Sequence, residues 1–157
     1  MTLRTGFSLP ELLLALAIAV VLAAIALPGL GAVRDEWDLR IATQAVLGGL
    51  SQARLGALAR HVEGHLCPSV DGQACVAGAA GFRVTAGEGP DQAVLRVAAL
   101  PGSVRLSADR PAATYYAWPR AALPVTLTLC ATRRQERSRQ IVVSQTGRPR
   151  VVRAAGC

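Results

Sequence analysis

The segment GFSLPELLLALAIAVVLAAIALP, residues 6–28, determines how this 157-residue chain begins its fold. The apolar character continues to Val33, and the 22 residues from Leu12 to Val33 carry no charge. As an α-helix, such a run spans about 33 Å, which is enough for a hydrocarbon core of about 30 Å. The sequence therefore predicts an N-terminal membrane-inserted helix followed by one domain of ordinary composition.

A glutamate, Glu11, stands at the start of this apolar run, and two general interpretations account for it. In a plain signal anchor, Arg4 stays on the inner side and Ser8-Leu9-Pro10-Glu11 forms an S-x-x-E capping box. In a cleaved signal peptide, residues 24–26 would provide the A-x-A cleavage site. Neither interpretation requires a glycine at position 6 together with a glutamate at position 11.

The pattern Gly6-Phe7-Ser8-x-x-Glu11 before an apolar helix resembles the class III signal of type IV pilins and pseudopilins. The resemblance implies that a prepilin peptidase removes residues 1–6 and methylates the new N-terminus at Phe7. It also implies that Glu11 is an assembly residue, whose carboxylate pairs with the Phe7 amine of a neighbouring pilin subunit. An unpaired carboxylate in an apolar bundle costs several kcal/mol, so this pair would favour one axial register of the filament.

The rest of the chain predicts an α+β fold. Residues 7–33 are expected to form the membrane half of the helix and residues 34–64 an amphipathic half, with Gly64 as its end. The apolar face of this second half is expected to contain Leu39, Val46, Leu50 and Leu58. Residues 65–157 are expected to form a small β domain, with antiparallel strands, in two sheets, packed against the helix. The expected strands are residues 81–86, 93–99, 103–107, 114–118, 125–130, 139–145 and 149–154.

Four cysteines allow three pairings, and export to an oxidising compartment favours two disulfides. We expect Cys67 to pair with Cys75 across a short loop and Cys130 to pair with Cys157, which would hold the C-terminus. A zinc site is the alternative, since His61 and His65 lie near the first two cysteines. Their spacing matches no familiar zinc motif, so we expect no metal.

The net charge of +7 is concentrated near the C-terminus. Residues 7–129 carry nine arginines and nine acidic residues, whereas residues 130–157 carry seven arginines and a single acid, Glu136. A basic region of this kind predicts an acidic partner. The acidic cluster of Asp35, Glu36 and Asp38 is expected to be solvated or to contact another subunit. The chain lacks G-x-S-x-G and has no lysine for a Walker motif, so we expect no enzymatic activity and no cofactor.

Residues 67–75, a strand ending at Cys130 and the C-terminal residues 141–157 resemble the FimT/GspH group of minor pilins and pseudopilins. The resemblance implies an inner-membrane protein with a periplasmic domain that later enters a pilus or pseudopilus. FimT-like members bind DNA and help its uptake in natural transformation, whereas GspH-like members are structural pseudopilins of type II secretion. A third alternative is a minor pilin that only primes assembly. The basic C-terminal region favours the FimT-like function, with DNA as partner.

The DNA-binding element is expected at Gly147-Arg148-Pro149-Arg150, which matches a G-R-x-R element of FimT-like proteins. Thr146-Gly147 is expected to form the turn between two strands, and alternation places Arg148 and Arg150 on one face. Pro149 lacks an amide donor and suits an edge strand. The basic surface is expected to include Arg153 and, in the preceding loop, Arg133, Arg134, Arg137 and Arg139. The alternative is a solvated hairpin whose arginines only protect an exposed edge.

Overall fold

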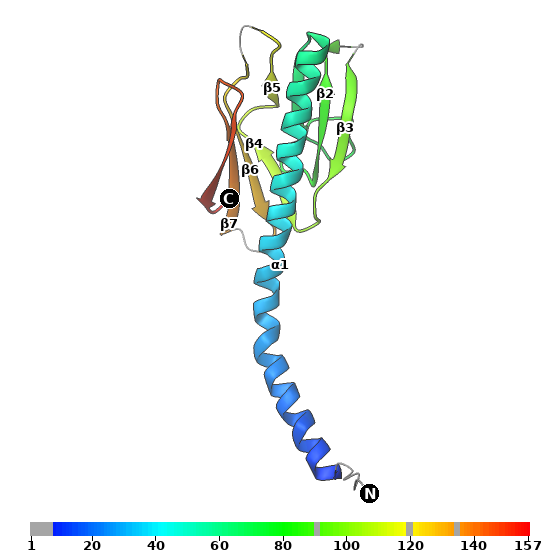
Figure 1. Cartoon of the computed structure of the whole chain (residues 1–157), viewed down its shortest axis with the longest axis vertical. Coiled ribbons are helices and arrows are strands. Elements are labelled where there is room, and N and C mark those ends of the chain that lie inside the picture. The colour runs from blue at the N-terminus through cyan, green and yellow to red at the C-terminus, as the bar shows by residue number, and fades with distance from the viewer. Residues whose placement is uncertain (1–7, 90–91, 119–120, 134–135) are drawn as a thin grey trace, which may run out of the picture. The chain divides into compact units, whose positions relative to one another are not determined.

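The computed structural model describes residues 8–89, 92–118, 121–133 and 136–157, with the exception of the side chains of residues 26–30 and 155. These residues form one long helix and eight strands (Figure 1). The elements are α1 (Leu9–Arg60), β1 (Gly64–Pro68), β2 (Gly81–Ala86), β3 (Ala93–Ala99), β4 (Val104–Ala108), β5 (Ala113–Tyr115), β6 (Val125–Ala131), β7 (Arg137–Val143) and β8 (Pro149–Ala155). The chain divides into two compact units, Met1–Arg34 and Asp35–Cys157.

In the first unit, α1 begins with a capping box. The Ser8 carbonyl accepts hydrogen bonds from the backbone N–H groups of Glu11 (3.0 Å) and Leu12 (3.1 Å). The Glu11 carboxylate turns back to Ser8, where it lies 3.5 Å from the backbone nitrogen and 3.4 Å from Oγ. Glu11 therefore caps its own helix, as an S-x-x-E motif predicts. Its role between subunits stays a prediction, and Gly6 and Phe7 lie outside the described residues.

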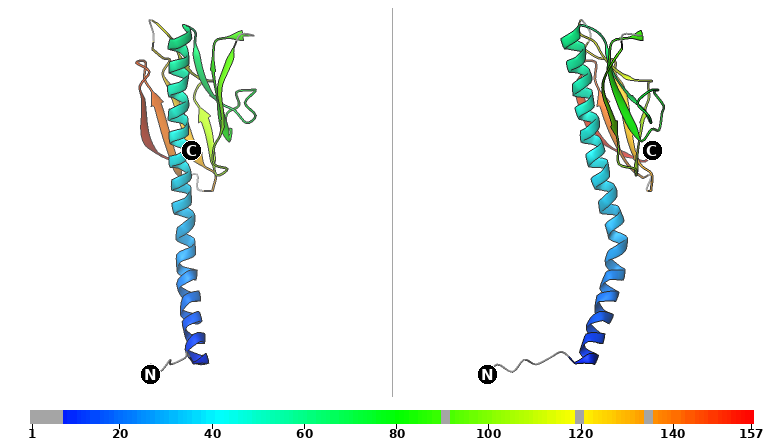
Figure 2. Two further views of the ribbon diagram at one scale, coloured as in Figure 1. Left: turned by 45° about the vertical axis from the view of Figure 1, so that its right-hand side comes forward. Right: turned by 90° about the vertical axis from the view of Figure 1, so that its right-hand side faces the viewer.

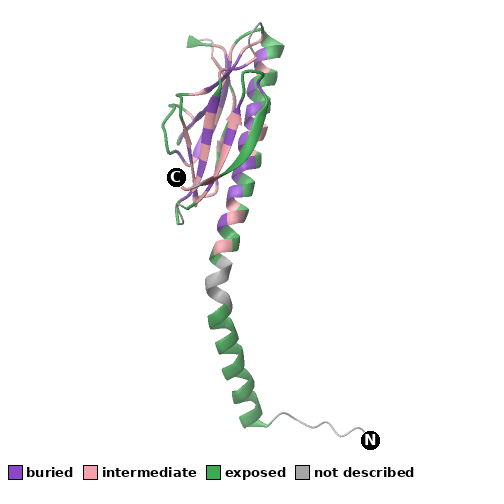
Figure 3. Cartoon of the chain, turned by 90° about the vertical axis from the view of Figure 1, so that its left-hand side faces the viewer, coloured by how far each residue is buried: buried purple, intermediate pink, exposed green. Residues whose placement is uncertain are grey.

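The side chains of residues 8–25 are all exposed (Figure 3). They include a long series of large apolar residues, from Leu9 to Ile25. Within the described residues, no helix is both long enough and apolar enough to cross a membrane.

The second unit consists of two four-stranded sheets and the C-terminal part of α1. The strand orders are β3-β2-β1-β5 and β4-β6-β7-β8. Every pairing between neighbours is antiparallel. Figure 2 shows this part of α1 lying along the sheets. The expected α+β class, with a long helix packed on antiparallel sheets, is confirmed.

Most strands follow the apolar alternation of the sequence, but β1 (Gly64–Pro68) was not among the expected strands, and β7 begins and ends two residues earlier than expected. The runs at residues 81–86 and 93–99 are β2 and β3, and β6 alternates between buried and half-buried side chains along its length. The run at residues 114–118 is different, because β5 ends at Tyr115. Tyr116 donates its N–H to the Ala121 carbonyl (3.1 Å), so the chain turns there and Trp118 lies in a loop.

One face of α1 belongs to the core of the second unit. Its buried residues recur every three or four positions and are Leu39, Ala42, Val46, Leu50, Ala53 and Ala57. They pack in one cluster with the inward-facing residues of both sheets. Leu58 was expected on this face but is 45% exposed. It follows Ala57 by one residue, which is about 100° around the helix, so it points away from the core.

Gly64 begins β1, so the end of the helix expected there is corrected to Arg60. The chain leaves the helix at His61, which has a positive φ of 55°. A Cβ atom on residue 64 would lie 2.1 Å from the Ala53 carbonyl oxygen. Glycine therefore allows β1 to approach the helix backbone closely, which is a packing requirement rather than a helix-stop signal.

Both expected disulfides are present. Cys67 in β1 pairs with Cys75, with their Cα atoms 5.5 Å apart, and Cys130 in β6 pairs with Cys157, with their Cα atoms 5.9 Å apart. The zinc alternative that used the first two cysteines is therefore excluded, because disulfide sulfurs are not thiolate ligands.

Candidate nucleic-acid interface

The connection between β7 and β8, residues 144–148, is a turn closed by its own hydrogen bonds. The Gly147 N–H donates to the Ser144 carbonyl (2.8 Å), and the Ser144 N–H donates to the Arg148 carbonyl (3.2 Å). Gly147 has a φ of 74°, and a Cβ atom there would lie 3.2 Å from the Tyr115 ring. Position 147 requires glycine both for its backbone conformation and for this close approach.

Arg148 and Arg150 are exposed beside this turn. Arg150 lies opposite Val142 of β7, on the face of the sheet that points away from the core. Pro149 begins β8, which is the edge strand of its sheet, as expected from its missing amide donor. The two arginines border a shallow hollow whose other lining residues are Val142, Ser144, Thr146 and Pro149. Two arginines and two hydroxyl-bearing residues therefore line one surface.

Arg139 and Arg153 lie on the opposite face of this sheet. They are register partners in β7 and β8, and Arg139 shares its face of β7 with Ile141, which is buried in the core. The Arg139 side chain is only 17% exposed and forms an ion pair with Glu36 of α1. Because Arg150 and Arg153 are three residues apart in a strand, their side chains point to opposite faces. Arg139 therefore connects sheet and helix, and Arg153 does not extend the surface of Arg150.

The other C-terminal arginines are also more dispersed than expected. Arg137 and Arg139 lie in β7 and not in the loop before it, which corrects the expected placement. Arg133 is exposed in the connection between β6 and β7, and Arg134 lies outside the described residues. The candidate surface is therefore centred on Arg148 and Arg150.

Trp118 was expected to lie in a strand and was not among the expected binding residues. It is 86% exposed and lies in the connection between β5 and β6. The same connection contacts the turn, since the Ala122 N–H donates to the Gln145 carbonyl (3.2 Å). An exposed aromatic ring offers a surface on which a nucleic-acid base can stack. The signal in the sequence was the proline after Trp118, which is typical of a loop or turn.

The C-terminus is tied back across the sheet at the end of β8 that lies far from the turn. The Ser138 hydroxyl donates to the Gly156 carbonyl (2.7 Å) and lies 3.1 Å from the Ala154 carbonyl. The next residue, Cys157, then joins Cys130 of β6. The edge strand that begins beside Arg148 is therefore held covalently at its other end.

The acidic cluster near the start of the second unit is not simply solvated. Asp38 accepts a hydrogen bond from Ser103, and Glu36 accepts from Arg139 and from Arg40 (3.3 Å). Asp35 is 2% exposed, and its Oδ1 atom has no hydrogen-bond partner within the described residues. Burial acts to raise the pKa of Glu36, but hydrogen bonds from Arg139 and Arg40 outweigh it and leave the pKa below its ordinary value. Glu36 and Asp38 join α1 to the sheets and Asp35 is buried, which corrects the expected solvated face, whereas a contact with another subunit stays a prediction.

Comparison with known proteins agrees with this architecture. The family model described as type II transport protein GspH matches residues 42–147, which is more than half of the chain. The chain therefore belongs to the GspH family, the group of minor pilins and pseudopilins that the sequence resembles. The matched residues end at Gly147, so they do not include Arg148 or Arg150. No curated protein sequence matches the chain.

Two crystal structures of the type IV minor pilin FimU from Pseudomonas aeruginosa show the same fold. The first has a TM-score of 0.59 and 16% sequence identity, covering 78% of this chain and 96% of FimU. The second has a TM-score of 0.56 and 17% identity, covering 76% of this chain and 99% of FimU. At this level of identity the likeness shows the type IV pilin fold alone.

Proposed function

We propose that this minor pilin binds DNA through the β7–β8 hairpin and assists DNA uptake in natural transformation. The observation that carries the proposal is the pair of exposed arginines, Arg148 and Arg150, beside a rigid turn at the edge of a sheet. Neither arginine forms an ion pair with a carboxylate within the described residues, in contrast to Arg139. Two unpaired guanidinium groups are suited to phosphate oxygens.

Such a surface would bind DNA without sequence preference. Base readout requires an element that enters a groove, whereas an exposed turn with two arginines contacts phosphates. Each neutralised phosphate releases counterions, so affinity falls steeply with salt. Trp118 adds an exposed ring that could stack on an unpaired base, which favours single strands as an additional ligand.

The test is a titration of the full chain, in a non-ionic detergent, with labelled DNA at several salt concentrations. Changing Arg148 and Arg150 to glutamine is expected to weaken binding roughly 10- to 100-fold at about 0.1 M salt. The slope of log affinity against log salt should become shallower by about 2, since two phosphate contacts are lost. The measurement is fluorescence anisotropy on double- and single-stranded DNA of unrelated sequences.

A matched control removes the same charge elsewhere. Arg60 and Arg110 are both exposed and lie outside the C-terminal region. Their double change to glutamine should leave affinity within about threefold of the unchanged protein, because only the general charge is altered. If both double variants lose affinity equally, binding is a general charge effect and the hairpin is not the DNA site. If both double variants bind DNA with the affinity of the unchanged chain, the DNA-receptor proposal fails.

The N-terminal part of the proposal concerns anchoring and assembly. We propose that a prepilin peptidase removes residues 1–6, that residues 7–33 anchor the protein in the inner membrane before assembly, and that Glu11 then pairs with a neighbouring subunit. The exposed apolar side chains from Leu9 to Ile25 support this, because water is an unfavourable environment for them.

Glu11→Ala is expected to leave cleavage after Gly6 intact and to reduce entry into filaments several-fold, because the neighbour's Phe7 amine loses its partner. The measurement is the amount of processed protein in sheared filaments relative to the amount in membranes. Ser8→Ala is the control, since it removes the hydroxyl of the helix cap and keeps the carboxylate. Equal loss in both variants would show that Glu11 acts only as a cap.

A secretion pseudopilin is the second candidate function. The observation in its favour is that the matching family model is described as a type II transport protein. The pseudopilin function predicts no DNA binding, so the DNA titration described above separates the two candidate functions.

A further inference from the structure

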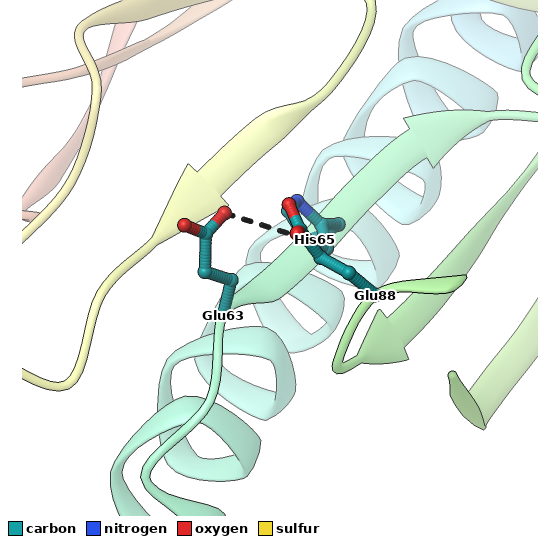
Figure 4. A group of neighbouring side chains, drawn as sticks. All are labelled: Glu63, His65 and Glu88. Carbon is teal, nitrogen blue, oxygen red and sulfur yellow. Dashed lines mark ion pairs between the residues drawn. The ribbon is translucent and has the colours of Figure 1, made fainter. Parts of the chain in front are cut away.

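Three side chains with metal-binding atoms meet at the end of the second unit where α1 leads into β1. Glu63 precedes β1, His65 lies in it, and Glu88 follows β2. One atom from each, two carboxylate oxygens and an imidazole nitrogen, lie within 4.8 Å of one another (Figure 4). The backbone brings them together, because His65 pairs with Thr85 across β1 and β2 and the Gly87 N–H donates to the Glu63 carbonyl (2.7 Å).

The imidazole of His65 is oriented for this role by a residue outside the group. Its Nδ1 atom lies 3.2 Å from the Thr114 hydroxyl, on the neighbouring strand β5. The Nε2 atom faces the carboxylates and lies 3.8 Å from Glu63. If Nδ1 carries the proton and donates it to Thr114, the lone pair of Nε2 points at the two acids. Histidine ligands of metals are held in this way by a hydrogen bond at the second ring nitrogen.

The group of Glu63, His65 and Glu88 carries a net negative charge whether or not the imidazole is protonated. Two carboxylates face one imidazole, and within the described residues neither carboxylate forms an ion pair with an arginine. Arg83 lines the adjacent hollow with His65 and Glu88, but its guanidinium is held by the Gln73 carbonyl and by Gln92. The hollow opens to solvent and provides a path for an ion. A divalent cation would neutralise the two acids.

We propose that Glu63, His65 and Glu88 form a binding site for a divalent transition metal, with Zn²⁺ as the best match. One imidazole and two carboxylates are a ligand set that zinc accepts, with water in the fourth position. Ligand bonds of about 2.0–2.2 Å place ligand atoms roughly 3–3.5 Å apart, so separations of up to 4.8 Å must shorten by as much as about 1.3–1.8 Å. Glu88 is exposed in the β2–β3 connection and can make that movement. The bound ion would fasten this connection to the start of β1.

This site differs from the zinc set considered from the sequence, and it does not depend on the proposed DNA function. It shares only His65 with that set, and its other ligands are carboxylates instead of cysteines. Glu63 and Glu88 are 25 residues apart in sequence, so no spacing motif could have indicated them.

The test is isothermal titration calorimetry of the full chain with Zn²⁺ alone, which measures the affinity and the stoichiometry of zinc binding. The protein is purified without a histidine tag, stripped of metal and kept oxidised in a non-ionic detergent. We expect one zinc per chain, and a loss of affinity of at least tenfold in Glu88→Gln and in His65→Gln. Glu88→Gln is the decisive variant, because this exposed side chain can be changed without disturbing the core.

His61→Gln is the matched control, because the chain has one other histidine and it is exposed. This variant should bind zinc like the unchanged protein. A second readout replaces zinc by Co²⁺, whose absorption should show nitrogen and oxygen ligands and no thiolate charge-transfer band. Absence of zinc binding by the unchanged chain would overturn the proposal. Unaltered affinity in Glu88→Gln, or equal loss in His61→Gln, would also overturn it.

Discussion

Replacing Gly64 by alanine is expected to destabilise the second unit by about 3 kcal/mol or more, which is at the upper end for overpacking. A Cβ atom at this position would lie 2.1 Å from the Ala53 carbonyl oxygen and 2.9 Å from its carbonyl carbon. Both are backbone atoms of α1, so no side chain can rotate away. Either β1 must move from the helix, or the helix must bend, and each would loosen the packing around Leu66 and Leu50.

The measurement is the denaturant concentration at the midpoint of unfolding of the full chain, monitored by far-UV circular dichroism. Gly102→Ala is the matched control, since a Cβ atom there would have no neighbour within 4 Å. It should change the free energy of unfolding by less than about 0.5 kcal/mol. Comparable midpoints for the two variants would show that β1 does not approach the helix as closely as described.

Removing the Cys130–Cys157 disulfide is expected to lower the free energy of unfolding by roughly 3–4 kcal/mol. The bond closes a loop with a sequence separation of 27 residues. In the chain-entropy model, a longer loop restricts the unfolded chain more, so this bond should contribute more than Cys67–Cys75, which spans 8 residues and would contribute roughly 2–3 kcal/mol. Removing the bond also removes the covalent attachment of the C-terminus to β6. This matters for β8 because it is an edge strand, with a neighbouring strand on one side only.

Two double-serine variants, one for each disulfide, provide the comparison under non-reducing conditions. Chemical denaturation of the full chain measures stability, and the DNA titration measures whether the hairpin keeps its shape. The variant at positions 130 and 157 should lose more stability and more DNA affinity than the variant at positions 67 and 75. If the shorter bond proves to be the more stabilising, the loop-entropy argument does not apply to this protein.

The local features of the fold were readable from the sequence because each depends on residues close together in the chain. The S-x-x-E box predicted the cap at Ser8, and the apolar alternation predicted the strands at residues 81–86 and 93–99. A glycine between two alternating runs predicted the turn at Gly147. Strand ends were not readable in the same way: the sequence pattern extended a strand to Trp118, but the backbone hydrogen bond from Tyr116 to Ala121 ends the pairing earlier.

Which residues share a surface was decided only by the tertiary structure. Seven C-terminal arginines looked like one basic region, yet Glu36, more than a hundred residues earlier, pairs with Arg139 and removes it from that surface. Alternation alone could have separated Arg150 from Arg153, but not shown which of them faces the core. The close approach of Gly64 to α1 and the group of Glu63, His65 and Glu88 also depend on contacts between distant elements. Sequence patterns define periodicity within one element, whereas the face that is buried and the neighbour that it meets depend on the packing of distant elements.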